Sequence, residues 1–246
     1  MSDAPRSSFS ASIVDHRDQK IRLRRIVSAY DGLLVRSYCV IRFNIININM
    51  LHILALCMRR RTRVLEVGCG FGLFACYFAS RSPELTYHGI DIDAHRIAMA
   101  EKAAGRLGLT NVRFACGDAS APLEVDGLYD AIVMMDLLHH LNDEAKRHLL
   151  DTAVAHLAPG GCLIVKDVTR KPAWKMGFTW LLDVLMTRGF EMWYWDPATV
   201  RGAVDPALAC EAYPITDWLP YPHIIYLFQK PGADASTGGA ATTARA

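Results

Sequence analysis

The pattern of apolar positions separates a helical N-terminal part from an alternating remainder. From Arg17 to Arg60 apolar residues recur at helical spacing, and Asp31-Gly32 is expected to break this stretch into two or three helices. The residues expected to face inward are Ile21, Ile26, Tyr30, Leu33, Leu34 and Val35. Residues 1–16 and the Gly/Ala/Thr-rich residues 231–246 lack such a pattern, so we predict a flexible N-terminus and a disordered tail.

In the remainder, short apolar runs alternate with helical stretches. Strands are predicted at 63–67, 86–90, 112–116, 131–135 and 162–166, and helices at 73–80, 94–107 and 144–156. This alternation predicts a parallel sheet with helices on both faces. A short helix at 197–204 and two strands near 208–215 and 223–229 follow; they have no helix between them, which predicts an antiparallel hairpin at the sheet edge. We therefore expect a Rossmann-like, doubly wound seven-stranded α/β sheet over 61–230, preceded by a helical segment over 17–60.

Cysteine usage and the N-terminal residues favour a cytoplasmic protein. The seven cysteines are odd in number and scattered, and they include no C-x-x-C pair, which indicates reduced thiols and neither a disulfide framework nor a zinc site. The first ten residues lack the apolar core of a signal peptide. The run 43–57 is uncharged, but its 15 residues fall short of the roughly 20 that a membrane-spanning helix needs.

Charge is distributed unevenly along the chain. Residues 1–63 carry 12 Lys/Arg and 4 Asp/Glu, whereas residues 64–246 carry 15 and 21. A basic N-terminal third suits an acidic membrane surface, a phosphorylated substrate or nucleic acid. The alternative is that these arginines only cover the outer faces of helices. Peripheral membrane contact stays open, and nucleic acid is disfavoured because no recognition module is visible.

The strand at 63–67 runs into a glycine-rich loop, Glu66-x-Gly68-Cys69-Gly70-x-Gly72. A strand, a glycine turn and a helix N-terminus together let the backbone approach a ligand closely. The spacing differs from the G-x-G-x-x-G of dinucleotide sites and from the G-x-x-x-x-G-K-S/T of phosphate loops. A carboxylate two residues before the first glycine would repel a pyrophosphate, but it suits a ligand with an ammonium or sulfonium group.

This loop resembles the first motif of class I methyltransferases that depend on S-adenosylmethionine (SAM), and further motifs of that family follow in order. Asp91, about 20 residues after the loop, is placed to accept both hydroxyls of a ribose, while Asp93 is placed to cap the next helix. Asp118 ends the third strand, and the resemblance implies that it and Ala119 hold the adenine. The resemblance covers roughly residues 62–168 and the hairpin ending.

The resemblance implies SAM as the cofactor and the activity of a methyltransferase. The cofactor site that it implies consists of Glu66, Gly68, Cys69, Gly70, Gly72, Asp91, Ile92, Asp118, Ala119, Met135 and Asp136. It does not identify the methyl acceptor, because this fold serves many acceptors.

Two adjacent histidines follow the fourth strand, where the methyl group of SAM should lie. The stretch from Leu138 to Glu144 resembles the L-H-D-W-S-D-E segment of plant-type small-molecule O-methyltransferases, whose histidine is a general base. That histidine matches His139, and a neutral imidazole can do this work. His140 is the second candidate, as a contact to the cofactor or to the start of the next helix.

Asp136 and Asp167 end neighbouring strands, and paired carboxylates there could hold a divalent metal, as in catechol-type O-methyltransferases. That family also has an Asn after its second acid, whereas Val168 follows Asp167 here. We therefore predict no metal.

Aromatic residues are concentrated in an insert at 170–195. Trp174, Phe178 and Trp180 recur at helical spacing, and together with His223 they are the predicted substrate contacts. The alternative is a helix packed on the sheet. With the segment 17–60 as a cap on the other side, an apolar pocket favours a hydrophobic acceptor that is aromatic, polyketide-like or lipid-like and is methylated on oxygen.

Three alternatives stay open. The first is a small-molecule N- or C-methyltransferase, which does not need a base such as His139. The second is an RNA or protein methyltransferase that uses the basic N-terminal segment. The third is a non-catalytic SAM-binding protein on the same fold. Neither the acceptor, the pathway nor the oligomeric state follows from the sequence.

Overall fold

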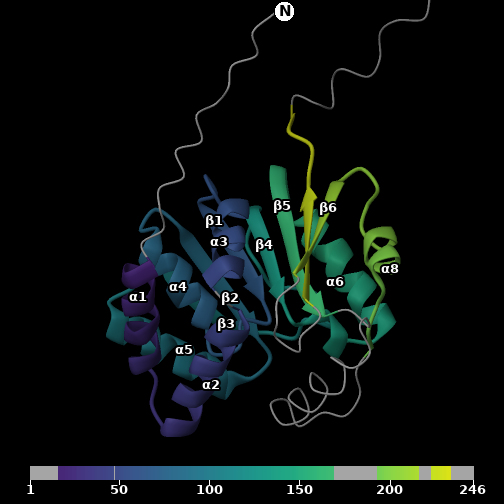
Figure 1. Ribbon diagram of the computed structural model, residues 1–246. Helices are drawn as coiled ribbons and strands as arrows, with labels where there is room; N and C mark the ends of the chain where they lie inside the picture. Colours follow the sequence, from purple (N-terminus) through teal and green to yellow (C-terminus); the bar gives the residue numbers. More distant parts are fainter. Residues whose placement is uncertain (1–15, 47, 169–192, 216–222, 234–246) are drawn as a thin grey trace, which may run out of the picture.

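Strands with almost fully buried residues form the centre of one mixed sheet. In the computed structural model, which describes residues 16–46, 48–168, 193–215 and 223–233, the strand order is β3-β2-β1-β4-β5-β7-β6 (Figure 1). The strands are β1 (Arg63–Val67), β2 (Thr86–Asp91), β3 (Val112–Cys116), β4 (Tyr129–Met135), β5 (Leu157–Val168), β6 (Ala209–Ile215) and β7 (His223–Gln229). The first five are parallel, and β7 runs antiparallel to both β5 and β6. This confirms the predicted doubly wound sheet with an antiparallel hairpin.

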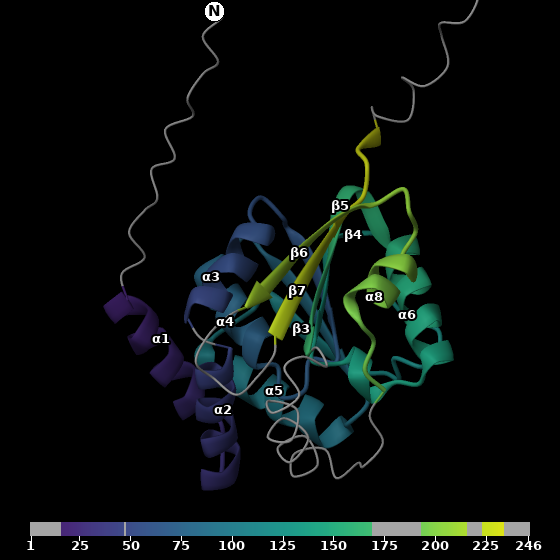
Figure 2. The ribbon, with the colours of Figure 1, turned by 45° about the vertical axis from the view of Figure 1, so that its right-hand side comes forward.

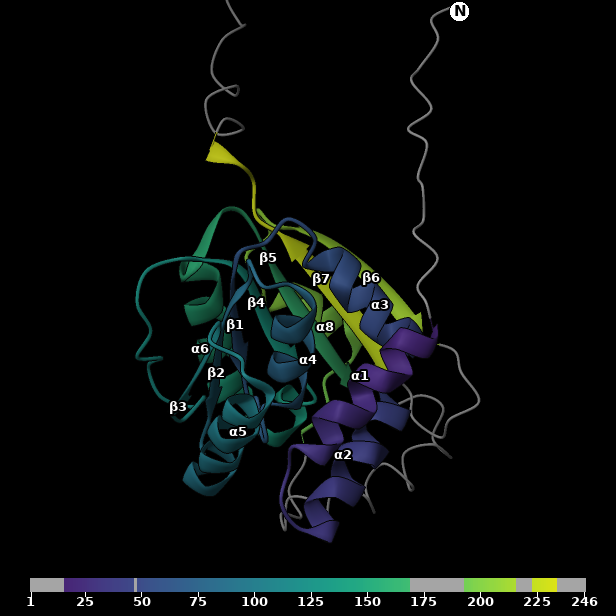
Figure 3. The same cartoon turned by 90° about the vertical axis from the view of Figure 1, so that its left-hand side faces the viewer.

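Helices cover both faces of the sheet. They are α1 (His16–Ser28), α2 (Leu33–Ile45), α3 (Ile48–Cys57), α4 (Leu73–Arg81), α5 (Ala94–Leu107), α6 (Asp143–Ala155) and α8 (Pro197–Gly202), with a short 3₁₀ helix, η1 (Leu138–His140). The N-terminal helices lie with α4 and α5 on one face, and α6 and α8 lie on the other (Figures 2 and 3). Each face has its own apolar core, because alternate residues of β1 point to opposite sides: Val64 belongs to the first core and Leu65 to the second.

The N-terminal helices share the first core with the sheet. Phe43 of α2 packs edge-on against Phe74 of α4, with ring centroids 6.2 Å apart. The hydroxyl of Tyr30, just after α1, donates to the backbone carbonyl of Phe71 in the glycine loop at 2.7 Å. Ile26 and Tyr30 are each only 1% exposed, as predicted. These contacts attach the N-terminal segment directly to the loop that follows β1.

Three residues predicted to face inward do not. Ile21 is 55% exposed, Leu33 81% and Leu34 87%. Ile21 lies on the exposed side of α1, whereas for Leu33 and Leu34 the reason is the reversal of the chain at Gly32, whose φ of 77° starts α2 in a new direction. Leu33 and Leu34 therefore stand in the first turn of α2, at the corner between two helices, and not on the packed face of α1.

Strand β5 starts earlier than the sequence pattern predicts. It begins at Leu157 and not at Cys162, with an irregular register against β4 near Tyr129. Gly160, at φ 71°, lies inside this strand, and the side chain of Gln229 donates to its carbonyl at 2.7 Å. The Gln229 side chain thus replaces the backbone donor of a neighbouring strand. The strand can therefore continue through Gly160 and Gly161.

Within the described ranges, no single helix is long and apolar enough to cross a membrane. The bent pair Leu33–Ile45 and Met50–Cys57, at 77° to each other, reaches the required length and composition only when the two are counted together. The predicted flexible N-terminus, most of the aromatic insert and most of the tail lie outside the described residues.

Candidate active site

The glycine loop after β1 contains three glycines whose backbone has the left-handed conformation. The φ angles of Gly68, Gly70 and Gly72 are 76°, 55° and 67°. A Cβ on Gly72 would come within 2.6 Å of the Phe114 ring, and a Cβ on Gly68 within 2.9 Å of Leu137. A Cβ on Gly70 would meet nothing within 4 Å. Gly68 and Gly72 therefore serve packing, whereas Gly70 leaves open backbone that a ligand can approach.

Asp91, at the end of β2, braces this loop. One carboxylate oxygen accepts from the Gly70 amide at 2.7 Å and the other from the Asp93 amide at 3.0 Å. Asp93 in turn accepts from the amides of His95 and Arg96 and caps α5, as predicted. Carboxylate oxygens have more lone pairs than these two bonds use, so Asp91 can still accept from the hydroxyls of a ribose.

Glu66 is a buried acid at the end of β1. It is 1% exposed and accepts a hydrogen bond from the Tyr87 hydroxyl at 3.1 Å. Burial raises the pKa of Glu66 to about 8, although Tyr87 and the positive charge of Arg42 act in the opposite direction. The carboxyl is therefore mostly protonated at neutral pH, until a cation arrives beside it.

A pocket of about 170 Å³ brings most of the predicted residues together. It is lined by Glu66, Gly68, Cys69, Gly70, Asp91, Met135, Asp136, His139 and His140. The same pocket is lined by Tyr38, Ile41, Arg42 and Ile45 of α2, and by Phe71, Leu73 and Phe74 beside the glycine loop. The sequence pattern placed the N-terminal segment here only as a general cap, without singling out these α2 residues.

Four predicted cofactor residues do not line this pocket. Gly72 starts α4 against Phe114, and Ile92 is 67% exposed. Asp118 is exposed and accepts from the amide and the hydroxyl of Ser120 at 2.8 and 2.7 Å, which lower its pKa. Ala119 next to it is buried. Their contact with the adenosine part of a cofactor stays a prediction.

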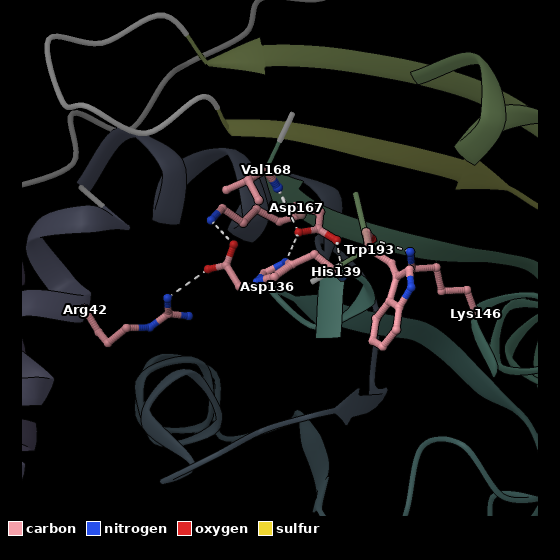
Figure 4. A network of polar contacts seen from close by, with 8 residues as sticks. Arg42, Asp136, His139, Lys146, Asp167, Val168 and Trp193 are labelled. Atoms are coloured by element: carbon pink, nitrogen blue, oxygen red, sulfur yellow. Dashed lines mark hydrogen bonds and ion pairs between the residues drawn. The ribbon is translucent and has the colours of Figure 1, made fainter. Parts of the chain in front are cut away.

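His139 and Asp167 form a buried pair beside the pocket (Figure 4). The Nδ1 atom of His139 lies 2.5 Å from Asp167 Oδ1, and the His139 amide donates to Oδ2 at 3.2 Å. The two residues are 2% and 7% exposed. A carboxylate on Nδ1 holds a proton on that nitrogen, so the basic lone pair of the imidazole lies on Nε2.

The imidazole of His139 is also held by its neighbours. The Tyr194 ring stacks on it at a centroid distance of 5.6 Å and an angle of 10°. The Trp193 amide donates to the His139 carbonyl at 2.9 Å, and the fully buried Lys146 donates to the Trp193 carbonyl. This part of the aromatic insert therefore positions the histidine.

Asp136, at the end of β4, has a strained backbone and two cationic partners. Its φ of 55° is uncommon for a residue with a side chain. Arg42 donates to Oδ2 at 2.8 Å, and the fully buried Lys166 donates to Oδ1. Burial raises the pKa of Asp136, but the positive charges of Lys166 and Arg42 outweigh it and hold the pKa well below its usual range.

The two carboxylates considered for a metal are thus engaged separately, Asp136 with two cations and Asp167 with His139. In the part of the chain that the structure describes, no group of three or more His, Cys, Asp or Glu is arranged to hold a metal ion. The cysteines are free thiols: four are buried, Cys57 and Cys210 are half-buried, and Cys116 is exposed.

The predicted substrate contacts are placed only in part. Trp174, Phe178 and Trp180 lie outside the described residues. His223 is 3% exposed at the start of β7, paired with Val168 of β5, and does not itself line the pocket.

Several site residues were missed or given another role by the sequence pattern. Arg42, Lys166 and Tyr87 were not singled out, and Asp167 was considered only as a metal ligand. Its position at the carboxyl end of β5, beside the strand that leads to His139, was the signal that could have paired the two.

Comparison with known proteins agrees with this fold. Residues 64–161 match the family model of a methyltransferase domain. The chain is 32% identical over 106 residues to ribosomal RNA small subunit methyltransferase C of Acinetobacter baumannii, covering 40% of this chain and 30% of the relative. It is 29% identical over 115 residues to ubiquinone biosynthesis O-methyltransferase of Psychrobacter cryohalolentis, covering 45% of this chain and 42% of the relative. The chain thus spans less than half the length of these curated relatives.

Solved structures share most of the fold. An O-methyltransferase family protein from Burkholderia thailandensis superposes with a TM-score of 0.66 at 19% identity, covering 88% of this chain and 69% of that one. Magnesium protoporphyrin IX methyltransferase from Synechocystis PCC 6803, with bound SAH, gives a TM-score of 0.60 at 19% identity, covering 87% and 94%.

The family match assigns residues 64–161 to a methyltransferase domain, and the described fold is that of solved SAM-dependent methyltransferases. SAM is the cofactor of that domain class. The residues present fit it, because the open backbone at Gly70, the braced carboxylate of Asp91 and the buried acid Glu66 face one pocket.

Proposed function

We propose that this protein transfers a methyl group from SAM to a hydroxyl group of a hydrophobic small molecule. The observation that carries the proposal is the buried pair of His139 and Asp167, 2.5 Å apart, beside the pocket that the glycine loop and Asp91 share. A histidine oriented in this way by a carboxylate is suited to take a proton from a hydroxyl group.

The chain's own residues provide binding, orientation and proton transfer, while SAM, when bound, supplies the activated methyl group. Asp91 and the Gly70 backbone would hold the sugar, and Glu66 would ionise beside the ammonium group. His139 Nε2 would accept the hydroxyl proton as the oxygen attacks, and Asp167 would stabilise the imidazolium. Positioning of this kind contributes roughly 7–11 kcal/mol in favourable cases, and a general base adds about 10²–10⁴-fold.

The apolar wall of the pocket supports a hydrophobic acceptor. Tyr38, Ile41 and Ile45 of α2 line it together with His139, and Phe71 and Phe74 add apolar surface beside the glycine loop. An aromatic, polyketide-like or lipid-like molecule would bury its body against this wall and present its hydroxyl to the histidine.

A nitrogen or carbon acceptor is the alternative. The relatives that match the domain are named for ribosomal RNA and for ubiquinone biosynthesis, so the family match does not choose the acceptor. Dependence on His139 separates the two cases, because a neutral amine or a carbanion does not require this base.

The test has two stages. S-adenosylhomocysteine (SAH), titrated against the protein with NADH and ATP as controls, should alone raise the melting temperature, since ligand at 100 times its Kd adds roughly 2.7 kcal/mol of stability. Hydrophobic phenols and alcohols are then tested with methyl-labelled SAM, each beside its O-methylated counterpart as a blocked control. No stabilisation by SAH would overturn SAM binding. SAH binding combined with label transfer only to amine or carbon acceptors would overturn O-methylation.

A further inference from the structure

A second pocket, of about 380 Å³, lies at the opposite end of the sheet from the glycine loop. It is formed by the end of α3, the turn at 58–62 before β1, the end of α4 and the turn at 82–85 before β2. The active-site pocket follows the carboxyl ends of these parallel strands, whereas this pocket precedes their starts. Strand β1 and helix α4 separate the two.

The charge of this pocket is strongly positive. Its lining includes Arg59, Arg60, Arg61 and Arg81, but only one acid, Glu84. The side chains of Arg59, Arg60 and Arg81 form no hydrogen bond or ion pair with any residue in the described part of the chain. These three guanidinium groups are therefore free to meet an anion.

Helix ends do not account for the cluster. The C-termini of α3 and α4 point here, and each is equivalent to about half a negative charge, so together they offset about one of the arginines. The arginines also do not cap these helices. The one that bonds a carbonyl, Arg61, reaches Gly160 of β5 at 2.6 Å and not a carbonyl of α3 or α4.

Arg60 has a backbone conformation that normally favours glycine. Its φ is 65°, in the turn after α3 where the Arg61 amide bonds the Met58 carbonyl at 3.0 Å. A side chain in the left-handed region costs roughly 1–2 kcal/mol. This turn places Arg60 among the residues that line the pocket, between Arg59 and Arg61.

Beside Thr62 and Ser82, the lining has an apolar part and one buried polar atom without a hydrogen-bond partner among the described residues. Ala55, Leu56, Met58, Phe78 and Leu85 form the apolar part. His52 also lines the pocket, and its Nδ1 atom is shielded from solvent without a hydrogen-bond partner among the described residues. A ligand with a polar group beside an apolar body would satisfy both features.

We propose that this pocket binds an organic phosphate, with the arginines on the phosphate and the apolar floor under the organic part. Guanidinium groups bind phosphate through paired hydrogen bonds and keep their charge at any physiological pH. A single hollow with arginines beside an apolar patch fits one phosphorylated group better than the extended backbone of a nucleic acid, which needs a continuous basic track.

The test uses the full chain and phenyl phosphate as the probe, with phenol and inorganic phosphate as the two half-ligands. Calorimetry should show phenyl phosphate binding more tightly than inorganic phosphate, with no binding of phenol. Arg59→Gln and Arg81→Gln should each weaken phenyl phosphate at least tenfold and leave SAH affinity unchanged. Arg24→Gln is the matched control, because this exposed arginine of the same basic segment lies outside the pocket. If Arg24→Gln lost as much phenyl phosphate affinity as the pocket variants, the effect would come from net charge alone, and the proposed site would be overturned.

Arg60→Gly separates binding from folding. The glycine removes the strained side chain, so the variant should melt at the same or a higher temperature and yet bind phenyl phosphate more weakly. Unchanged binding in this variant would contradict the role of Arg60.

Vesicles distinguish the sources of the phosphate. Co-sedimentation with phosphatidylcholine vesicles that contain phosphatidic acid, and not with phosphatidylcholine alone, assigns the site to a lipid headgroup. Phenyl phosphate binding without co-sedimentation assigns it to a soluble phosphate ester. Binding to a single-stranded RNA that depends on Arg59 and Arg81, without phenyl phosphate binding, would overturn the proposal in favour of nucleic acid.

Discussion

Arg42, in helix α2, lies 2.8 Å from the carboxylate of Asp136 at the end of strand β4. The two residues are 94 positions apart in the chain. The Arg42 guanidinium also lies over the Phe74 ring, 5.7 Å from its centroid. One side chain of the N-terminal segment thus meets both the strained corner after β4 and the helix after the glycine loop.

Arg42, Asp136 and Lys166 form a charged cluster. Removing Asp136 should cost more folding free energy than removing Arg42. Asp136→Ala leaves the fully buried Lys166 without its acid, which costs roughly 3–5 kcal/mol of folding free energy. Arg42→Ala should cost less, because Asp136 keeps Lys166. Urea unfolding measures both. The double change Asp136→Ala with Lys166→Met should recover most of the loss, and a single Asp136→Ala that costs no more than Arg42→Ala would contradict this account.

Two glycines of the loop provide a matched comparison. Gly70→Ala and Gly72→Ala both place a methyl group on a left-handed residue, so the backbone strain is similar. Only Gly72→Ala also drives a Cβ to within 2.6 Å of Phe114. We expect Gly72→Ala to lower the melting temperature more than Gly70→Ala does. Gly70→Ala should remain folded but lose SAH affinity. Calorimetric melting and SAH titration test both, and the reverse order in stability would refute the assignment.

Asp91 and Asp93 separate ligand binding from helix capping. Asp91→Ala removes the acceptor for the Gly70 amide and for the ribose, and should nearly abolish SAH binding. Asp93→Ala removes the cap of α5 and should cost about 1 kcal/mol of stability while SAH still binds. Equal affinity for SAH in the two variants would show that Asp91 only supports the loop.

The affinity for SAH should increase with pH. The pKa of Glu66 is raised to about 8 by burial, so below that pH the carboxyl must lose a proton before it can pair with the ligand's ammonium group. Each pH unit below 8 can therefore weaken binding by at most about tenfold. Calorimetry between pH 6 and pH 9 in buffers of different ionisation enthalpy should show proton release.

Glu66→Gln is the control for this pH dependence. This variant should make SAH affinity nearly independent of pH. Any pH dependence that remains comes from a titrating group of the ligand. The same shift makes the fold lose stability as pH rises from the ordinary Glu pKa through about 8, because the unfolded chain gives up this proton first. Glu66→Gln should therefore melt higher than the natural chain at pH 8, while it binds SAH more weakly.

His139 and Asp167 should act as a unit. His139→Ala should spare SAH binding and lower kcat by about 10²–10⁴-fold on a hydroxyl acceptor. Asp167→Asn should also lower kcat, since Nδ1 then lacks the acid that sets the tautomer. The double variant should be no slower than His139→Ala alone, because the carboxylate works through the imidazole. Additive losses would show that Asp167 has a separate, structural role, and unchanged turnover in His139→Ala would remove it as the base.

Much of the sheet follows from the sequence because buried strands are local apolar runs. The runs at 63–67 and 86–90, with the glycine loop after the first and Asp91 after the second, predict both a doubly wound sheet and the edge where a ligand binds. The partners of Asp136 cannot be predicted from the sequence in the same way. Arg42 is far away in sequence and resembles any other arginine of a basic helix, so only the packing of α2 brings it to β4. The exposure of Leu33 and Leu34 likewise depends on the turn at Gly32, which apolar spacing does not encode.

The hydrogen bond from Tyr30 to Phe71, together with the packing of Phe43 on Phe74, has a consequence for how this type of enzyme can diversify. The N-terminal segment, whose helix α2 lines the pocket, cannot be exchanged as an independent module, since its removal would expose the first core to water. The pocket can be reshaped through positions of α2 that line it, such as Ile41 and Ile45, whereas a graft from a relative must also carry the residues that contact Phe71 and Phe74.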